Sequence, residues 1–267
     1  MDHHPLSGRR IVVTRPAAQS RALITQLQAL GAAPLVCPAI AIAPLADYSA
    51  LDAAIACLAE YNWLIVTSVN GVHTLLARMA ELGADQAALQ RLKIGAIGPA
   101  SAQALVKYGL HAQFMPTAYV AEAILDQIGD LAGQRVLLPR ADIAREILAI
   151  GLRERGAQVD EIAAYRTVPG DGATELARHI EASTIDAITF TSSSTVRYTL
   201  DGLEQIGIER GRAVALLNQT AIVCIGPITA ATARAEGLRV DAMAQQFTSD
   251  GLVAALVEWF NQPAPQT

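Results

Sequence analysis

Short apolar runs alternate along the chain with longer segments in which apolar residues recur at helical spacing. The run 11–14 is followed by a helical pattern over 17–30, and the run 136–138 by one over about 142–155. Four further runs predict strands that end in a small polar turn before a helix: 64–66, 94–97, 187–190 and 222–225. This alternation predicts an α/β protein with parallel sheets that are covered by helices on both faces.

The same sequence pattern occurs twice along the chain. Leu6, Gly8, Arg10, Arg15 and Gly31 return 125 positions later (131 minus 6) as Leu131, Gly133, Arg135, Arg140 and Gly156. Thr67-Ser68-Val69-Asn70 corresponds to Thr191-Ser192-Ser193-Ser194, and Gly98-Pro99-Ala100-Ser101 to Gly226-Pro227-Ile228-Thr229. Because α/β folds bind ligands in the loops past the carboxyl ends of their strands, we expect two similar Rossmann-like lobes with a ligand cleft between them.

Two extended segments, 38–44 and 163–169, interrupt the alternation at corresponding places in the two copies. Prolines at their ends disfavour helix, so they predict a two-stranded linker between the lobes. If the chain crosses at the first segment and returns at the second, lobe 1 comprises 1–38 and 167–267, and lobe 2 comprises 39–166. Two tandem halves are the alternative that these patterns leave open.

Composition narrows the classes of protein. Of the 267 residues, 52% are hydrophobic and 17% charged, enough apolar residues to fill two cores. A net charge of −5 argues against a nucleic-acid binder. The opening residues lack the apolar run of a signal peptide, and no segment approaches the roughly 20 apolar residues of a membrane span. Cys37, Cys57 and Cys224 are unpaired by motif, so we expect reduced thiols in a cytoplasmic protein that contacts no membrane.

The paired Gly-Pro turns are the first candidate binding elements. Gly98 and Gly226 allow a ligand close to the backbone, and Ser101 and Thr229 add hydroxyls beside the free amides of a helix start. The alternative is that these hydroxyls only cap their helices. A second pair of candidate loops is rich in hydroxyls, with more than one cap needs: Thr67, Ser68 and Asn70 in one copy, and Thr191, Ser192 and Ser193 in the other.

Three arginines could bind an anion. Arg15 and Arg140 stand at equivalent strand ends, and Arg145 is expected in the first turns of the helix that follows. Each could instead be an ordinary surface arginine. Tyr165 lies in the second linker segment, where it either packs against a neighbouring strand or donates a proton into the cleft.

The sequence lacks the motifs of several common ligand-binding and catalytic chemistries. No strand is followed by Gly-x-Gly-x-x-Gly, and no Gly-x-x-x-x-Gly-Lys-Ser/Thr occurs, which argues against a dinucleotide or nucleotide ligand. The five histidines form no group with metal-ligand spacing, so we expect no metal. Catalysis here would rely mainly on holding a substrate in one conformation.

With these motifs in place, the chain resembles the uroporphyrinogen-III synthase family over nearly its whole length. The resemblance rests on the order and spacing of six segments: 10–16, 67–72, 97–102, 164–167, 190–196 and 225–230. It implies two α/β lobes joined by a two-stranded connector, with both ends of the chain in one lobe, which favours the crossing arrangement over tandem halves.

The resemblance also implies a cofactor-free, cyclising hydro-lyase of tetrapyrrole and haem biosynthesis. Its substrate, hydroxymethylbilane, would be closed to uroporphyrinogen III with loss of water and inversion of ring D. Loss of the hydroxyl gives an azafulvene, and attack by the substituted carbon of the last ring gives a spiro intermediate. Tyr165 matches the family's linker tyrosine, which is proposed to assist departure of the hydroxyl. The resemblance further implies possible hand-over of the bilane from hydroxymethylbilane synthase.

Two departures from the family pattern stand out. Ser101 replaces the threonine of many relatives and keeps the hydroxyl, and the second hydroxyl loop has Ser194 where the first has Asn70. The main rival interpretation is a non-catalytic, two-lobed protein that binds a tetrapyrrole or another anionic metabolite. A nucleotide-dependent α/β enzyme is disfavoured by the missing phosphate motifs. No long exposed apolar face is evident in the helical patterns, so we expect a monomer.

Overall fold

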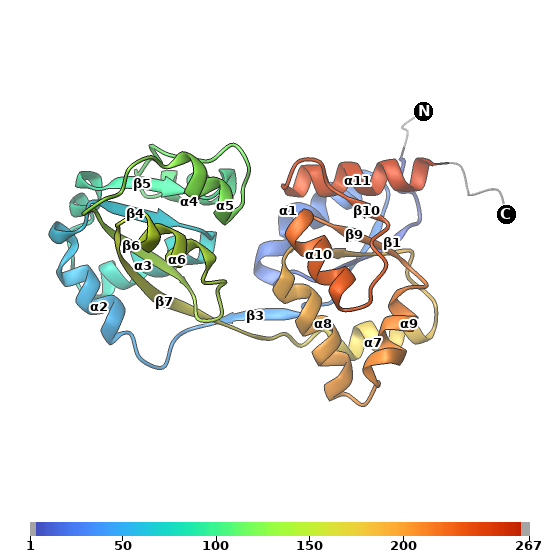
Figure 1. Cartoon of the computed structure of the whole chain (residues 1–267). Coiled ribbons are helices and arrows are strands. Elements are labelled where there is room, and N and C mark those ends of the chain that lie inside the picture. The colour runs from blue at the N-terminus through green and yellow to red at the C-terminus, as the bar shows by residue number, and fades with distance from the viewer. Residues whose placement is uncertain (1–3, 263–267) are drawn as a thin grey trace. The chain divides into compact units, whose positions relative to one another are not determined.

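The computed structural model describes residues 4–262, which form two compact α/β units (Figure 1). Unit 1 comprises the described residues up to Ala41 together with those from Val168 on, and unit 2 comprises Ile42–Thr167. The chain therefore leaves unit 1 at the first extended segment and returns to it at the second. An α/β fold built from two mostly parallel sheets is confirmed.

Unit 1 contains a five-stranded sheet in the order β10-β9-β8-β1-β2. Its strands are β1 (Arg10–Val13), β2 (Ala33–Val36), β8 (Ala187–Phe190), β9 (Ala221–Cys224) and β10 (Ala242–Met243), all paired in parallel. Two layers of helix cover it: α1 (Ala17–Ala29) and α11 (Ser249–Asn261) on one face, and α7 (Ala173–Glu181), α8 (Ser193–Gln205), α9 (Arg210–Leu217) and α10 (Pro227–Ala235) on the other. Burial on both faces explains why β8 and β9 read as continuous apolar runs.

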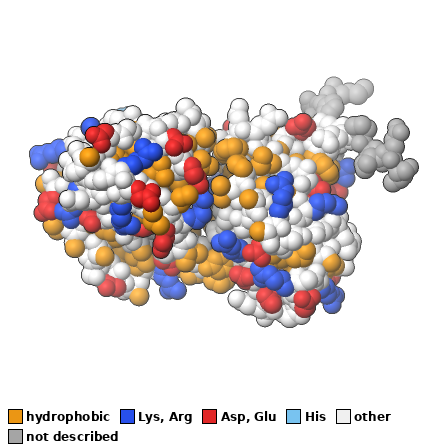
Figure 2. Space-filling model, in the orientation of Figure 1, with side chains coloured by type: hydrophobic (Ala, Val, Ile, Leu, Met, Phe, Trp, Pro, Cys, Tyr) orange, Lys and Arg blue, Asp and Glu red, His pale blue; other side chains and the backbone are white. Residues whose placement is uncertain are grey.

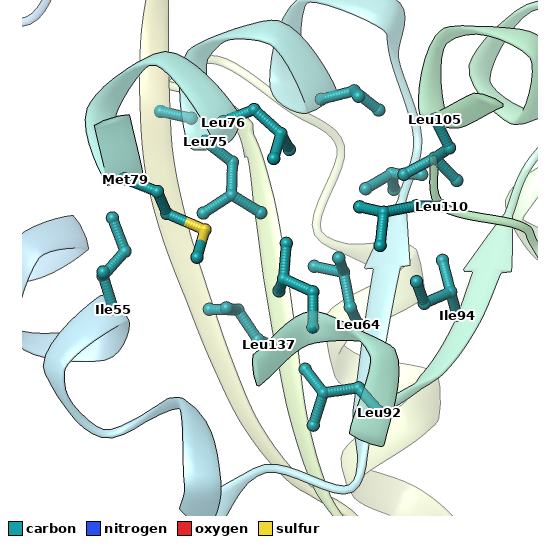
Figure 3. Close-up of a cluster of buried hydrophobic side chains, with 14 of the residues drawn as sticks. Ile55, Leu64, Leu75, Leu76, Met79, Leu92, Ile94, Leu105, Leu110 and Leu137 are labelled. Atoms are coloured by element: carbon teal, nitrogen blue, oxygen red, sulfur yellow. The ribbon is translucent and has the colours of Figure 1, made fainter. Parts of the chain in front are cut away.

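Unit 2 has the strand order β3-β7-β6-β4-β5. Its strands are β3 (Ile40–Ala43), β4 (Trp63–Val66), β5 (Lys93–Ala96), β6 (Arg135–Ala141) and β7 (Gln158–Pro169). One face packs on α2 (Ser49–Ala56), α3 (Val69–Glu81), α4 (Pro99–Val106) and the 3-10 turns Leu58–Glu60 and Gln86–Arg91, and the other on α5 (Ala121–Gln127) and α6 (Ile147–Glu154). Figure 3 shows the first of these cores, where Leu75, Leu76 and Met79 of α3 point at Leu64 and Leu137 of the sheet.

The two sheets correspond strand by strand. Read from one side, β9-β8-β1-β2 of unit 1 matches β5-β4-β6-β7 of unit 2, as the sequence repeat requires. In unit 1 the chain forms β1 and β2 on one side and then β8 to β10 on the other, and in unit 2 it forms β4 and β5 on one side and then β6 and β7 on the other, beside the edge strand β3. The reversal falls between β1 and β8 in unit 1 and between β6 and β4 in unit 2. Loops at such switch points form the usual ligand sites of α/β folds.

Two predicted boundaries on the second copy are wrong. β6 continues through Pro139 and Arg140 to Ala141, and α6 begins at Ile147 and not near 142. Proline is tolerated in this strand because the pairing of β6 with β4 ends at Leu137, so the missing N–H leaves no ladder bond unmade on that side. Arg145 consequently precedes α6 and lies outside its first turns.

The surface carries both signs of charge. Figure 2 shows basic and acidic side chains interspersed over the face in view.

Within residues 4–262, no helix has the length and apolar character needed to cross a membrane. All three cysteines are free thiols, with Cys37 and Cys224 buried and Cys57 half-buried.

Candidate functional site

The predicted site residues lie at the switch point of each sheet or in the loop beside it. In unit 1, Arg15 follows β1, Thr191 and Ser192 follow β8, and Gly226 follows β9. In unit 2, Thr67 and Ser68 follow β4, Gly98 follows β5, and Arg140 ends β6. Each unit therefore gathers its own set of polar groups at the carboxyl edge of its sheet.

Ser68 and Tyr165 are in direct contact in unit 2. The phenol of Tyr165 donates to Ser68 Oγ over 3.0 Å, although the two residues lie 97 positions apart. The tyrosine ring is buried among the core side chains of unit 2, with 7% of its surface exposed. Ser68 is the N-cap of α3 and accepts the Gly71 N–H over 2.9 Å. Tyr165 thus packs as a core residue and also aims its hydroxyl at the end of β4.

A pocket of about 380 Å³ has Tyr165 as one of its lining residues. It is lined by 42–44 at the edge strand, by Tyr48 and by one face of α3. Its cation, Arg78, is bound by both carboxylate oxygens of Asp52 at 2.6 and 2.7 Å and also by Glu81. Because that charge is already neutralised, the pocket offers little to an anionic ligand.

The hydroxyls of Ser101 and Thr229, which follow the two Gly-Pro turns, do not cap their helices. Gly98 and Gly226 are themselves the N-caps of α4 and α10, each followed by proline at the first helical position and without a side-chain cap bond. Ser101 and Thr229 are buried in the first turn, with 4% and 5% of their surface exposed. Neither hydroxyl bonds to another described residue. The structure therefore argues against simple capping and leaves two matched hydroxyls for a ligand.

Sequence reasoning missed an aromatic residue beside each turn. A Cβ on Gly98 would lie 3.2 Å from the ring of Tyr119, and one on Gly226 would lie 3.2 Å from the ring of Phe247. Both aromatic residues stand 21 positions after their glycine (119 minus 98, 247 minus 226). That equal offset is the signal that could have found them, because each ring covers its glycine from the loop before the next helix.

The second hydroxyl loop is bonded within itself. Ser192 caps α8, accepting the Thr195 N–H over 3.2 Å, and Thr195 completes a capping box. Ser193 bonds Thr232 of α10 over 2.7 Å, and Ser194 lies 3.0 Å from Ser192 Oγ. Ser193 and Ser194 therefore help to order this loop. Thr191 is half-buried at the strand end, and so are Thr67 and Asn70 at the equivalent place in unit 2.

The two equivalent arginines have different surroundings. Arg15 is half-buried, donates from Nη1 to Ser249 Oγ over 3.2 Å, and forms no ion pair with a carboxylate of residues 4–262. Burial lowers the pKa of Arg15, because desolvation disfavours its charge. An anion placed here would relieve that cost.

Arg140 instead bonds to groups of the protein itself. It is buried, pairs with Glu161 Oε1 over 2.7 Å and donates to the Arg145 carbonyl over 2.8 Å. Desolvation lowers its pKa by more than the Glu161 carboxylate raises it. Arg145 is exposed and lies 3.6 Å from Glu122, an ion pair of little strength in water.

These observations define a class: a duplicated α/β protein whose matched loops carry hydroxyls and helix-start amides. One arginine of these loops, Arg15, has no carboxylate partner within residues 4–262, and a buried tyrosine aims its hydroxyl at the end of β4. A family model described as uroporphyrinogen-III synthase HemD matches residues 21–254. The chain belongs to the uroporphyrinogen-III synthase family, which comprises cyclising enzymes of haem biosynthesis.

Relatives support this assignment over the full length. The uroporphyrinogen-III synthase of Synechococcus elongatus is 34% identical over 272 aligned residues, covering 98% of this chain and 99% of that protein. A putative uroporphyrinogen-III synthase of Methanothermobacter thermautotrophicus is 30% identical, covering 92% and 96%. A crystal structure of a mutant uroporphyrinogen III synthase from Thermus thermophilus matches with a TM-score of 0.69 at 19% identity, covering 96% of this chain and 100% of that one, which shows a shared fold.

Proposed function

We propose that this chain closes hydroxymethylbilane to uroporphyrinogen III, with loss of water and inversion of ring D through a spiro intermediate. The observation that carries the proposal is the matched pair of buried hydroxyls, Ser101 and Thr229, neither of which has a partner among the described residues. Each hydroxyl stands in the first turn of a helix that follows a Gly-Pro turn, and its bonding capacity is available to a ligand.

The substrate class fits the kinds of donor present. Hydroxymethylbilane carries eight carboxylates, so separate hydroxyls, helix-start amides and Arg15 serve it better than one dense cluster of cations. Free bilane also closes to the symmetric isomer I. The enzyme must therefore favour attack at the substituted carbon of ring D by holding the chain in one geometry. We assign that task to Ser68, Gly98 and Ser101 in unit 2 and to Thr191, Ser192, Gly226 and Thr229 in unit 1.

Tyr165 is the group we assign to the chemical step. Its phenol donates a hydrogen bond to Ser68, just past the end of β4, and it assists departure of the substrate hydroxyl as water. Arg140 and Arg145 play a lesser part in this proposal, because one is paired with Glu161 and the other is exposed.

The setting of the enzyme is also a proposal. We place it in the cytoplasm, where three free thiols stay reduced, as a monomer that receives its substrate from hydroxymethylbilane synthase. Rapid hand-over would limit spontaneous closure to isomer I.

A coupled assay tests the reaction. Hydroxymethylbilane is generated in place with and without this protein, and the oxidised uroporphyrin isomers are separated by chromatography. We expect isomer III to replace isomer I in proportion to added protein. Persistent isomer I with folded protein present would contradict the proposal and favour a non-catalytic binding protein, which titration with uroporphyrinogen would then examine.

A further inference from the structure

Ser68 Oγ already accepts two hydrogen bonds. One comes from the Tyr165 phenol over 3.0 Å and one from the Gly71 N–H over 2.9 Å. A serine oxygen has two acceptor sites and one proton to donate. Both acceptor sites are therefore occupied, and the Ser68 proton has no acceptor among the described residues.

The two groups that donate to Ser68 are held in place by the surrounding packing. The Tyr165 ring is held in the core of unit 2, and the first turn of α3 is pressed against β6, where a Cβ on Gly71 would lie 3.0 Å from the Pro139 carbonyl oxygen. Ser68 is half-buried at the end of β4, beside the switch point. With both acceptor sites used, the Ser68 O–H is left to donate to a ligand bound past the end of β4, where α/β folds place their ligands.

We propose that Ser68 is the catalytic acid of the reaction and that Tyr165 acts through it as a positioning residue and proton source. This inference rests on the proposed function and deepens it. The geometry places a serine between the phenol and any ligand at the end of β4, so the tyrosine proton reaches the substrate in two transfers.

The step balances as follows. The bond between the hydroxymethyl carbon and its oxygen breaks, and the oxygen keeps the electron pair, takes the Ser68 proton and leaves as water. Ser68 takes the Tyr165 proton, which leaves a tyrosinate opposite an azafulvenium cation. Ring closure and rearrangement later release one proton from a ring carbon. That proton returns to the tyrosinate and restores both residues.

Substitutions at Ser68 separate proton transfer from capping. Ser68→Ala loses both roles, and we expect kcat for isomer III to fall by about 100-fold or more with little change in KM. Ser68→Asn keeps a good N-cap acceptor but has no transferable proton, so kcat should fall similarly while the melting temperature stays within about 2 °C. Ser68→Thr retains the hydroxyl and should keep kcat within about fivefold of the wild type.

Thr248→Ala is the matched control. Thr248 caps α11 by accepting the N–H of a glycine three residues on, as Ser68 does, but no tyrosine donates to it. This variant should lower the melting temperature as much as Ser68→Ala does and leave kcat unchanged. Equal losses of kcat in both variants would show that the Ser68 effect comes from capping, and would overturn the relay.

The double variant Ser68→Ala/Tyr165→Phe decides how the two residues act. In a relay the double variant is no slower than the slower single variant, because either change breaks the same path. If Tyr165→Phe is slow while Ser68→Ala and Ser68→Asn keep wild-type kcat, or if the losses multiply, Tyr165 acts directly and the relay is wrong. A wild-type protein that yields no isomer III overturns the proposed function and the relay together.

Discussion

Gly226 lies directly against the ring of Phe247, with 3.2, 3.3 and 3.7 Å between a Cβ at this glycine and three ring carbons. Gly226 is the N-cap of α10, the helix whose first turn carries Thr229, so this packing holds the start of that helix. The pair is repeated in unit 2 by Gly98 and Tyr119. The close approach explains why each turn carries glycine even though its φ, −177° at Gly226, is extended and open to any residue.

Gly226→Ala should therefore lower the free energy of unfolding by about 1 to 2 kcal/mol through overpacking against Phe247. Adding Phe247→Leu should recover part of that loss, because the smaller side chain makes room for the methyl group. Denaturant unfolding of both single variants and the double variant measures the coupling. Strictly additive losses would show that the ring is not what excludes a side chain at this position.

Arg15→Gln should weaken ligand binding without weakening the fold. The folded state lowers the pKa of Arg15, so it disfavours the charge that the arginine carries at neutral pH, and a neutral side chain removes that cost. We expect the dissociation constant for uroporphyrinogen III to rise about tenfold or more, since a charge-assisted bond contributes about 1.5 to 3 kcal/mol. Thermal unfolding should occur at the same temperature or higher.

The matched control for Arg15 is Arg21→Gln, on the exposed face of α1. It removes the same charge from the same helix region but not from the carboxyl edge of the sheet. Fluorescence titration of both variants at two salt concentrations separates local contact from general attraction. Equal affinity loss in the two variants would remove Arg15 from the site.

The structure assigns Arg140 mainly to stability, and a mutant pair tests this. Glu161→Gln leaves a buried cation without its carboxylate, and we expect the free energy of unfolding to fall by about 3 kcal/mol. This value is at the lower end for buried ion pairs because the Glu161 side chain is 23% exposed. Arg140→Met combined with Glu161→Leu removes both charges and should restore most of the loss. If this stable double variant loses substrate affinity, Arg140 also contacts the ligand.

Much of the fold could be predicted because its signals are local. The strand at 187–190 and the helix expected over 17–30 agree with the structure to within a residue, since an apolar run and a terminating glycine are read without knowing any partner. The edge strand β10 has only two residues, too few to form a pattern. β7 begins at Gln158, five residues before the predicted linker, because its first half carries polar side chains.

The places of the candidate loops in the fold were predictable from the sequence, and the contacts of their side chains were less so. The repeat located the loops, but whether an arginine faces a ligand depends on strand register. The register that sets Leu138 opposite Glu161 also brings that carboxylate to Arg140, whereas Arg15 pairs with no carboxylate of the described residues. Likewise the contact between Tyr165 and Ser68 joins residues that only the strand order of unit 2 brings together.

The buried thiols should make the protein sensitive to alkaline pH. Burial raises the pKa of Cys37 to about 11 and that of Cys224 to about 12, against an ordinary value of 9.0. Unfolding frees both thiols to ionise at their ordinary pKa, so the unfolded state releases protons first as pH rises. Stability from these groups is fully present below about pH 8 and declines from about pH 9 upward, by up to about 1.4 kcal/mol per pH unit for each thiol.

Unfolding in denaturant at several pH values between 7 and 10.5 measures this decline, and a Cys37→Ala/Cys224→Ala variant is the comparison. The variant loses packing at every pH, but its stability should fall less steeply above pH 9 than that of the wild type. Labelling with a thiol reagent at pH 8 provides a second readout, in which the half-buried Cys57 reacts first and the other two react only after unfolding. Parallel pH curves for the two proteins, or rapid labelling of all three thiols in the native state, would show that these cysteines ionise as freely in the folded protein as in water.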